Sequence, residues 1–130
     1  MNRLLIGRAR RTDRTTMGMN LLVLTTVGRK SGQPRETPLA WFPGPDGSWL
    51  VVASAGGAPA NPAWYLNLAA RPDEVTVEQA GRKVAVTARE LHGAERAEAW
   101  TKITTEVDQF RRYEEGTDRE IPVIRLTPRS

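Results

Sequence analysis

The feature that most constrains the fold is the seven-residue run Leu21–Val27, which is apolar on both of its alternating faces. Aliphatic and β-branched side chains in such a run predict a strand that is buried on both sides. A short segment, Gly28–Gly32, follows it and leads to a second predicted strand, Thr37–Phe42. Strands joined by so short a connection are antiparallel. This part of the chain is therefore predicted to form an antiparallel hairpin.

The rest of the chain continues the alternation of strands and turns. A Pro- and Gly-rich turn, Pro43–Gly47, precedes a third strand, Trp49–Ser54, and Asn61 is the expected N-cap of a helix that runs from Pro62 to about Ala70. The remaining expected elements are strands at Glu74–Gln79 (with Val75 and Val77 inward), Lys83–Leu91 and Ile121–Leu126, a turn at Ala80–Gly81, and a helix at Ala94–Val107 with Ala97, Trp100, Ile103 and Val107 on its apolar stripe; Gln109–Thr117 stays unassigned. This order predicts a mainly β protein, a closed or nearly closed, mostly antiparallel β-barrel with packed α-helices.

The length of 130 residues fits one domain, which we expect to span residues 19–130. Residues 1–18 are basic and are expected to form a tail or a short helix. No apolar run is long enough for a transmembrane helix, and the basic start lacks the apolar core of a secretory signal. We therefore expect a cytoplasmic protein, with peripheral contact at the inner face of an anionic membrane through the basic segment as the sharper alternative.

Residue counts exclude several kinds of chemistry. There are no cysteines and one histidine, His92, so Cys-ligated and His-rich metal sites are excluded, and no metal site is predicted. His92 is expected on a surface turn. The formal net charge of +4 is explained either by a compositional preference for arginine or by an anionic partner.

The segment Gly28–Arg35 concentrates groups that bind anions. Its glycines allow backbone N–H groups to converge on one point, and Ser31 adds a hydroxyl. Arg29 and Lys30 supply positive charge, and Arg35 adds a planar fork suited to phosphate or carboxylate. The spacing is not that of a P-loop. A phosphate site and a solvated basic turn both remain open from these residues alone.

A second glycine segment, Ser54–Gly57, follows the third strand. Gly56 and Gly57 would let the backbone approach a flat ligand closely, and the helix start at Asn61 comes next. A flexible connection is the alternative. Two glycine segments at the ends of neighbouring strands favour a cleft between them.

The aromatic residues divide between core and site. Trp100 is expected in the core, whereas Trp64 suits either the core or the cleft. Phe110 and Tyr113 are three residues apart and are expected to share a helix face. They form either a satellite core contact or the lip of a substrate pocket.

Five segments together resemble the deazaflavin-dependent nitroreductase family, small oxidoreductases of actinobacteria that use coenzyme F420. They are Leu24–Gly32, Pro34–Leu39, Val52–Gly57, Asn61–Leu68 and Thr117–Pro122. The resemblance extends from about Leu21 to Pro128. It implies a split β-barrel of the type that binds flavin mononucleotide.

The resemblance also implies roles for individual residues. The residues expected to hold the acidic tail and phosphate of F420 are Arg29, Lys30, Ser31, Gly32 and Arg35. The residues expected to line its ring and linker are Thr37, Pro38, Ala53, Ser54, Gly56, Gly57, Asn61, Ala63 and Trp64. Ser54 and Tyr113 are the candidate catalytic residues, which would orient the acceptor or relay a proton.

The implied reaction is hydride transfer from reduced F420 to a conjugated acceptor such as a quinone, an enone or a nitro compound. Phe110 replaces what resembles a tyrosine in the nitroimidazole-activating members, and Gly116 stands where an aromatic residue can occur, which argues against that substrate. The alternative is a non-catalytic barrel that carries a flavin, a haem or a fatty acid. Nucleic acid is not an expected partner, because the cations gather in one turn rather than along a groove. Monomer and homodimer both remain open.

Overall fold

The computed structural model describes residues 20–54, 60–117 and 119–129. Seven strands form one sheet in the order β2-β1-β5-β6-β7-β4-β3, and each pairing is antiparallel. The strands are β1 (Leu21–Val27), β2 (Pro34–Ala40), β3 (Phe42–Pro43), β4 (Trp49–Val52), β5 (Val75–Gln79), β6 (Arg82–Glu90) and β7 (Val123–Pro128). The helices are α2 (Ala63–Ala70), α3 (Gly93–Glu106) and α4 (Gln109–Glu115), with a 3₁₀ turn η1 at Pro45–Gly47. The mainly β, antiparallel architecture with packed helices is as predicted.

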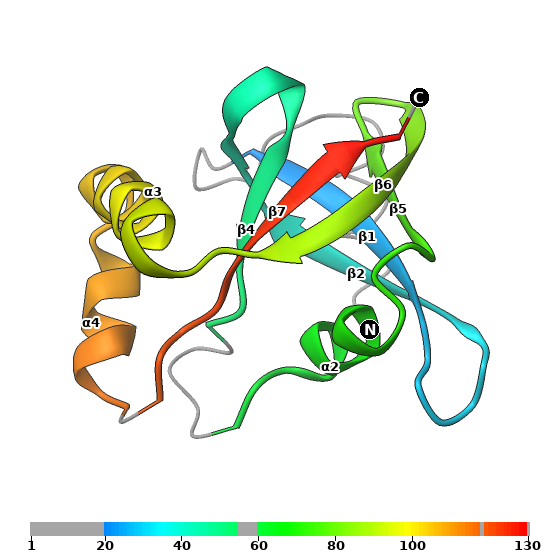
Figure 1. Ribbon diagram of the computed structural model, residues 1–130, viewed down its shortest axis with the longest axis horizontal. Coiled ribbons are helices and arrows are strands. Elements are labelled where there is room, and N and C mark those ends of the chain that lie inside the picture. Colours follow the sequence, from blue (N-terminus) through cyan, green and yellow to red (C-terminus); the bar gives the residue numbers. More distant parts are fainter. Residues whose placement is uncertain (1–19, 55–59, 118, 130) are drawn as a thin grey trace.

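The sheet curls around a first core (Figure 1). Its inner face supplies buried aliphatic residues, and α2 adds Trp64 and Leu68 to the same cluster. Val75 and Val77 point inward as predicted, because alternate residues of a strand face opposite sides of the sheet. Removal of this apolar surface from water is the main favourable contribution to the folding of the barrel.

A second core lies on the other face of the sheet, where α3 and α4 stand beside β4 and β7 (Figure 1). Ala99 and Ile103 of α3 are buried here against strand residues such as Leu50 and Val123. The stripe predicted for this helix was partly wrong, because Ala97 is exposed whereas Ala99 is buried. Residues two positions apart in an α-helix lie about 200° apart around its axis, so Ala97 and Ala99 cannot share a face.

The predicted strand Thr37–Phe42 is divided at Trp41 between the two edges of the sheet. β2 pairs with β1, whereas β3 pairs with β4. The chain thus passes from one edge strand to the other, which brings the curled sheet close to closure. The backbone N–H of Trp41 still donates to the carbonyl oxygen of Asn20, at 3.1 Å.

Other boundaries differ from the prediction by a few residues. Trp49–Ser54 ends as a strand at Val52, and the last strand starts at Val123 rather than Ile121. The unassigned segment Gln109–Thr117 contains α4. The N-terminal segment proposed as a tail or short helix lies outside the described residues. Within the described part of the chain, no helix has the length and apolarity needed to cross a membrane.

Candidate functional site

The turn between β1 and β2, Gly28–Gln33, has a fixed backbone. The N–H of Gly28 donates to the carbonyl oxygen of Gln33, and the N–H of Gly32 donates to that of Gly28, both at 2.8 Å. Gly32 has a φ of 71°, which favours glycine. A Cβ atom at Gly28 would lie 2.5 Å from Ser31 Oγ and 3.3 Å from the Gln33 carbonyl oxygen. The two glycines therefore make this shape possible.

Ser31 ties the turn to Arg35. Its Oγ accepts from the backbone N–H of Gln33 at 3.2 Å and from Arg35 Nη2 at 3.4 Å. The guanidinium of Arg35 is thereby held near the turn. Ser31, Gly32 and Arg35 are all exposed, so these predicted site residues are brought together at one surface.

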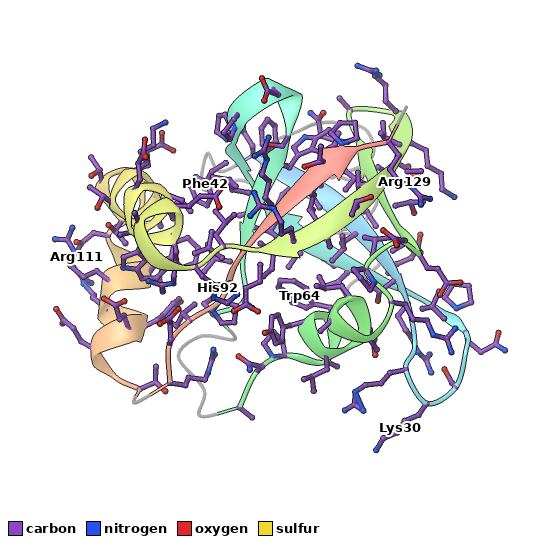
Figure 2. All side chains as sticks on the ribbon, in the orientation of Figure 1. Lys30, Phe42, Trp64, His92, Arg111 and Arg129 are labelled. Carbon is purple, nitrogen blue, oxygen red and sulfur yellow. The ribbon has the colours of Figure 1, made fainter. Side chains whose placement is uncertain are left out.

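The turn carries positive charge that has no internal partner in the described structure. Arg29 and Lys30 are exposed, and Lys30 points away from the body of the protein at the tip of the turn (Figure 2). Among residues 20–54, 60–117 and 119–129, no ion pair involves Arg29, Lys30 or Arg35. Clustered, unpaired cations repel one another and favour an anion between them.

Helix α2 is joined to the turn by a hydrogen bond. The backbone N–H of Arg29 donates to Asn67 Oδ1 at 3.0 Å, and Asn67 is buried. The sequence prediction assigned no role to Asn67. An asparagine inside a helix has poor helix propensity, so its presence at a buried position was the available signal for a side-chain contact.

A second group forms around Arg119. Its Nη1 donates to the carbonyl oxygen of Ala53 at 3.1 Å and to Asn61 Oδ1 at 2.8 Å, and its Nη2 donates to the carbonyl oxygen of Ser54 at 2.7 Å. We call Ala53, Ser54, Asn61 and Arg119 the Arg119 cluster. The prediction that Asn61 caps α2 was wrong: the N-cap residue is Pro62, no side chain caps the helix, and the Asn61 side chain bonds to Arg119.

The predicted ring-binding residues lie in different environments. Ala53 is fully buried, so its side chain is not accessible to a ligand. The neighbouring Ser54 is half-buried, so its side chain is partly accessible. Trp64 is 8% exposed and belongs to the first core, whereas Ala63 is exposed at the start of α2. Gly56 and Gly57 lie outside the described residues.

Thr37 and Pro38 of β2 lie on opposite faces of the sheet. Thr37 is opposite Leu24 of the first core, and Pro38 is opposite Val23. Residues opposite each other in a pair share a face, so Thr37 faces inward and Pro38 outward. The structure thus does not bring the side chains of these two predicted residues together.

Helix α2 connects the turn and the Arg119 cluster. Asn61 lies two residues before the first residue of the helix, Ala63, and Asn67 lies four residues further along, a helical rise of about 6 Å. Figure 1 shows α2 between the β1–β2 turn and the segment that leads into β7. A long ligand could therefore contact both groups along one helix.

Tyr113, a predicted catalytic residue, lies in α4. Its ring packs edge-on against Phe110 with centroids 6.0 Å apart, and both rings pack against the second core. The sequence therefore placed this pair on one face correctly. No contact among the described residues joins Tyr113 to Ser54. His92 is exposed just before α3, as predicted.

Two polar side chains near the site have notable environments. The hydroxyl of Tyr65 in α2 donates to Glu90 Oε1 of β6, and burial, followed by this hydrogen bond and the charge of Glu90, raises the pKa of Tyr65 to about 12. This contact fastens α2 to the sheet.

Thr26, directly before the turn, is 1% exposed, and its Oγ1 has no hydrogen-bond partner within the described structure.

A groove with a volume of about 210 Å³ lies elsewhere, between α3 and the β3–β4 hairpin. Its lining includes Leu50, Ala99, Lys102 and Arg125 and none of the predicted site residues. Arg125 is already bonded to Ser48 Oγ and to the Pro45 carbonyl oxygen. The residues predicted to bind an anion, Arg29, Lys30, Ser31 and Arg35, gather at the β1–β2 turn, so we place the candidate site there.

Comparison with known proteins decides the family. Residues 4–128 match the family described as F420H(2)-dependent quinone reductase. The chain belongs to this family. An F420H(2)-dependent quinone reductase of Mycobacterium tuberculosis (strain ATCC 25618 / H37Rv) is 38% identical over 111 residues, which cover 83% of this chain and 73% of that relative.

Solved structures agree with this assignment. An F420-H2 dependent reductase (FDR-A) superposes with a TM-score of 0.73 at 37% identity, over 82% of this chain and 92% of that chain. A structure described as a domain-swapped dimer has the same TM-score and identity, over 82% and 78% of the two chains. These comparisons confirm the predicted split-barrel fold and the predicted function as an F420H2-dependent reductase. The description of the family names quinones as the substrates and does not mention nitro compounds.

Proposed function

We propose that this chain binds coenzyme F420 and transfers a hydride from its reduced deazaflavin to a quinone. Arg29, Lys30, Ser31, Gly32 and Arg35 would hold the anionic tail. The observation that carries the proposal is a pair of cations, Arg29 and Lys30, on a turn whose shape is fixed, with Arg35 bonded to that turn from the start of β2; none of the three has an ion pair in the described structure. Positive charge with hydroxyl and amide donors fits phosphate and carboxylate groups.

The ring end of the cofactor would lie toward the Arg119 cluster. The side chains of Ser54, Asn61 and Ala63 are accessible there and would contact the ring. Thr37, Ala53 and Trp64 would support these residues from the inner side of the sheet, and Pro38 would contribute through its backbone alone. Gly56 and Gly57 remain part of the proposal from the sequence. Bound F420H2 supplies a hydride, and the protein contributes orientation and exclusion of water.

Ser54 and Tyr113 are proposed to act on the acceptor. Ser54 is half-buried within the Arg119 cluster, where Arg119 is bonded to its backbone carbonyl oxygen, so its hydroxyl can orient a carbonyl oxygen of the acceptor or pass a proton to it. Tyr113 lies in the second core with a half-buried side chain. It would reach the acceptor only from the α4 side, which makes it the weaker of the two candidates.

The partners proposed for the chain are a quinone-like acceptor and, following the domain-swapped neighbour, a second copy of itself. A cytoplasmic location, with membrane contact through the basic residues 1–18, stays part of the proposal. The competing function is a non-catalytic barrel that carries a flavin, a haem or a fatty acid. A flavin phosphate, a haem propionate or a fatty-acid carboxylate would also suit a cationic turn held by Asn67, so a titration is needed to separate the two functions.

A fluorescence titration tests the cofactor. Purified protein is titrated with oxidised F420 and, separately, with flavin mononucleotide. We expect F420 to bind more tightly, and Arg29→Ala/Lys30→Ala to weaken it about 100-fold, since two charge-assisted contacts are lost at about 1.4 kcal/mol each. Arg111→Ala/Arg112→Ala on α4 removes the same charge from exposed positions and should bind within about twofold of the parent. A preference for flavin mononucleotide would support the carrier instead.

A further inference from the structure

Arg119 lies at a junction between three parts of the chain. Its guanidinium donates to the carbonyl oxygens of Ala53 and Ser54, which follow β4, and to the side chain of Asn61, which precedes α2. These partners are 66, 65 and 58 residues away in sequence. The two ends of the segment between Ser54 and Asn61 are therefore joined through one side chain.

The chemistry of the side chain suits this task. A guanidinium is planar, always charged, and presents donors in a rigid fork, so two of its nitrogens can serve three acceptors in fixed directions. A lysine ammonium carries the same charge on a flexible stem without that fork. Hydrogen bonds from a charged donor are stronger than neutral ones, particularly when half-buried as here.

The segment that carries Arg119 is itself anchored. Ile121 is fully buried in the second core, and its carbonyl oxygen accepts from Arg96 Nη2 at 2.7 Å. The carbonyl oxygen of Pro122 accepts from the backbone N–H of Ala53 at 2.9 Å. Arg119 thus extends from a fixed base toward Ser54 and Asn61.

We propose that Arg119 is a positioning residue. It holds Ser54 and Asn61 in the arrangement that receives the ring end of the cofactor, and it does so without contacting the reacting atoms. This inference rests on the proposed F420 function. It assigns to Arg119 the role of fixing the ring end, as Asn67 fixes the turn at the tail end.

The test compares Arg119→Ala and Arg119→Lys with Arg125→Ala. Arg125 is a matched control, because its guanidinium also bonds to a carbonyl oxygen, that of Pro45 at 3.3 Å, and to a side-chain oxygen, Ser48 Oγ at 3.2 Å, at the other hairpin. For each protein we would measure F420 affinity by fluorescence, the melting temperature, and amide hydrogen exchange at Ala53, Ser54, Ala60 and Asn61.

We expect both Arg119 variants to weaken F420 binding about tenfold, the change that corresponds to 1.4 kcal/mol. Lysine should not rescue binding, because it restores the charge without the fork. Arg125→Ala should bind within about twofold of the parent even where its melting temperature falls equally. Exchange at Ala53, Ser54, Ala60 and Asn61 should be faster in the Arg119 variants alone.

Other outcomes overturn the inference. If Arg119→Lys binds like the parent, or if Arg125→Ala weakens binding as much as Arg119→Ala, Arg119 does not position the site. If the parent itself does not bind F420, the proposed function fails, and hydrogen exchange still tests the contact: unchanged exchange in both Arg119 variants would show that Arg119 holds nothing in place.

Discussion

Two of the hairpin turns in the described structure are closed by the same kind of backbone hydrogen bond but differ in how their polar side chains are bonded. Gly28–Gln33 joins β1 and β2, and Gly44–Ser48 joins β3 and β4. Each starts at a glycine whose N–H donates to the carbonyl oxygen at the far end of the turn, at 2.8 Å and 3.0 Å. In each, a side chain at the glycine would meet a serine hydroxyl, that of Ser31 or Ser48. Both turns thus share the closing hydrogen bond and the glycine–serine contact, although the second is one residue shorter and contains the 3₁₀ turn η1.

The difference lies in the side chains. Ser48 is buried, donates to the Pro45 carbonyl oxygen at 2.6 Å and accepts from Arg125, which also pairs with Asp46 at 3.6 Å. Ser31 is exposed, and the cations beside it have no ion pair in the described structure. A turn that satisfies its own charges stabilises the fold, whereas cations without an ion pair stay accessible from solvent, as the proposed contact with the F420 tail requires.

The largest stability effect is expected for Ser48→Ala. The change removes a buried hydroxyl and leaves the Pro45 carbonyl oxygen and Arg125 with one partner fewer, so we expect a loss of about 2 kcal/mol in the free energy of unfolding. Urea denaturation measures the loss, and the F420 titration should be unchanged within about twofold. A large loss of F420 affinity would break the comparison, because the two turns would not be independent.

Asn67→Ala is expected to cost less stability but to change binding. It removes the acceptor for the Arg29 N–H, whose turn is exposed and can bond to water instead, so we expect a loss of about 1 kcal/mol. Freed from α2, the turn should bind F420 about fivefold more weakly, since part of its preorganisation is lost. Ser48→Ala is the counterpart in the same two assays. Unaltered F420 affinity in Asn67→Ala would mean that the turn needs no support from the helix.

Tyr65→Phe tests how firmly α2, which carries Asn67, is fastened to the sheet. At neutral pH we expect a loss of up to about 1 kcal/mol from the missing hydrogen bond to Glu90. Because the folded pKa of Tyr65 is about 12, above its ordinary value of about 10, the contribution of Tyr65 is complete below pH 10 and is lost as pH rises toward 12.

Urea denaturation of parent and Tyr65→Phe at pH values from 7 to 12 measures this difference. The gap in stability between the two proteins should close above pH 10, since only the parent has a phenol to ionise at this position. A gap that stayed constant up to pH 12 would contradict the raised pKa.

Local sequence signals predicted the elements well where neighbouring residues decide the outcome. β1 has the predicted bounds, and Ala80–Gly81 forms the expected turn with φ values of 51° and 80°. The β1–β2 turn was identified from its glycines and cations, because those residues act within a few positions of one another.

Features that depend on distant partners were not predicted. Asn61 has the sequence position of a helix cap, but its side-chain oxygen accepts a hydrogen bond from the guanidinium of Arg119, 58 residues away. Trp41 divides one predicted strand between two partners, because β2 pairs with β1 and β3 with β4. Neither outcome follows from local propensity, since both depend on how the sheet curls.

The outer edge of β2 has a further consequence, for self-association. The N–H of Trp41 points toward β1, so the N–H groups at even positions of β2 point away from the sheet. Two of the four even positions in Pro34–Ala40 are Pro34 and Pro38, which have no N–H. A foreign strand that docks on this edge finds half of the usual donors missing. Pro34 and Pro38, which follow the β1–β2 turn, thus protect this edge of the sheet from edge-to-edge aggregation.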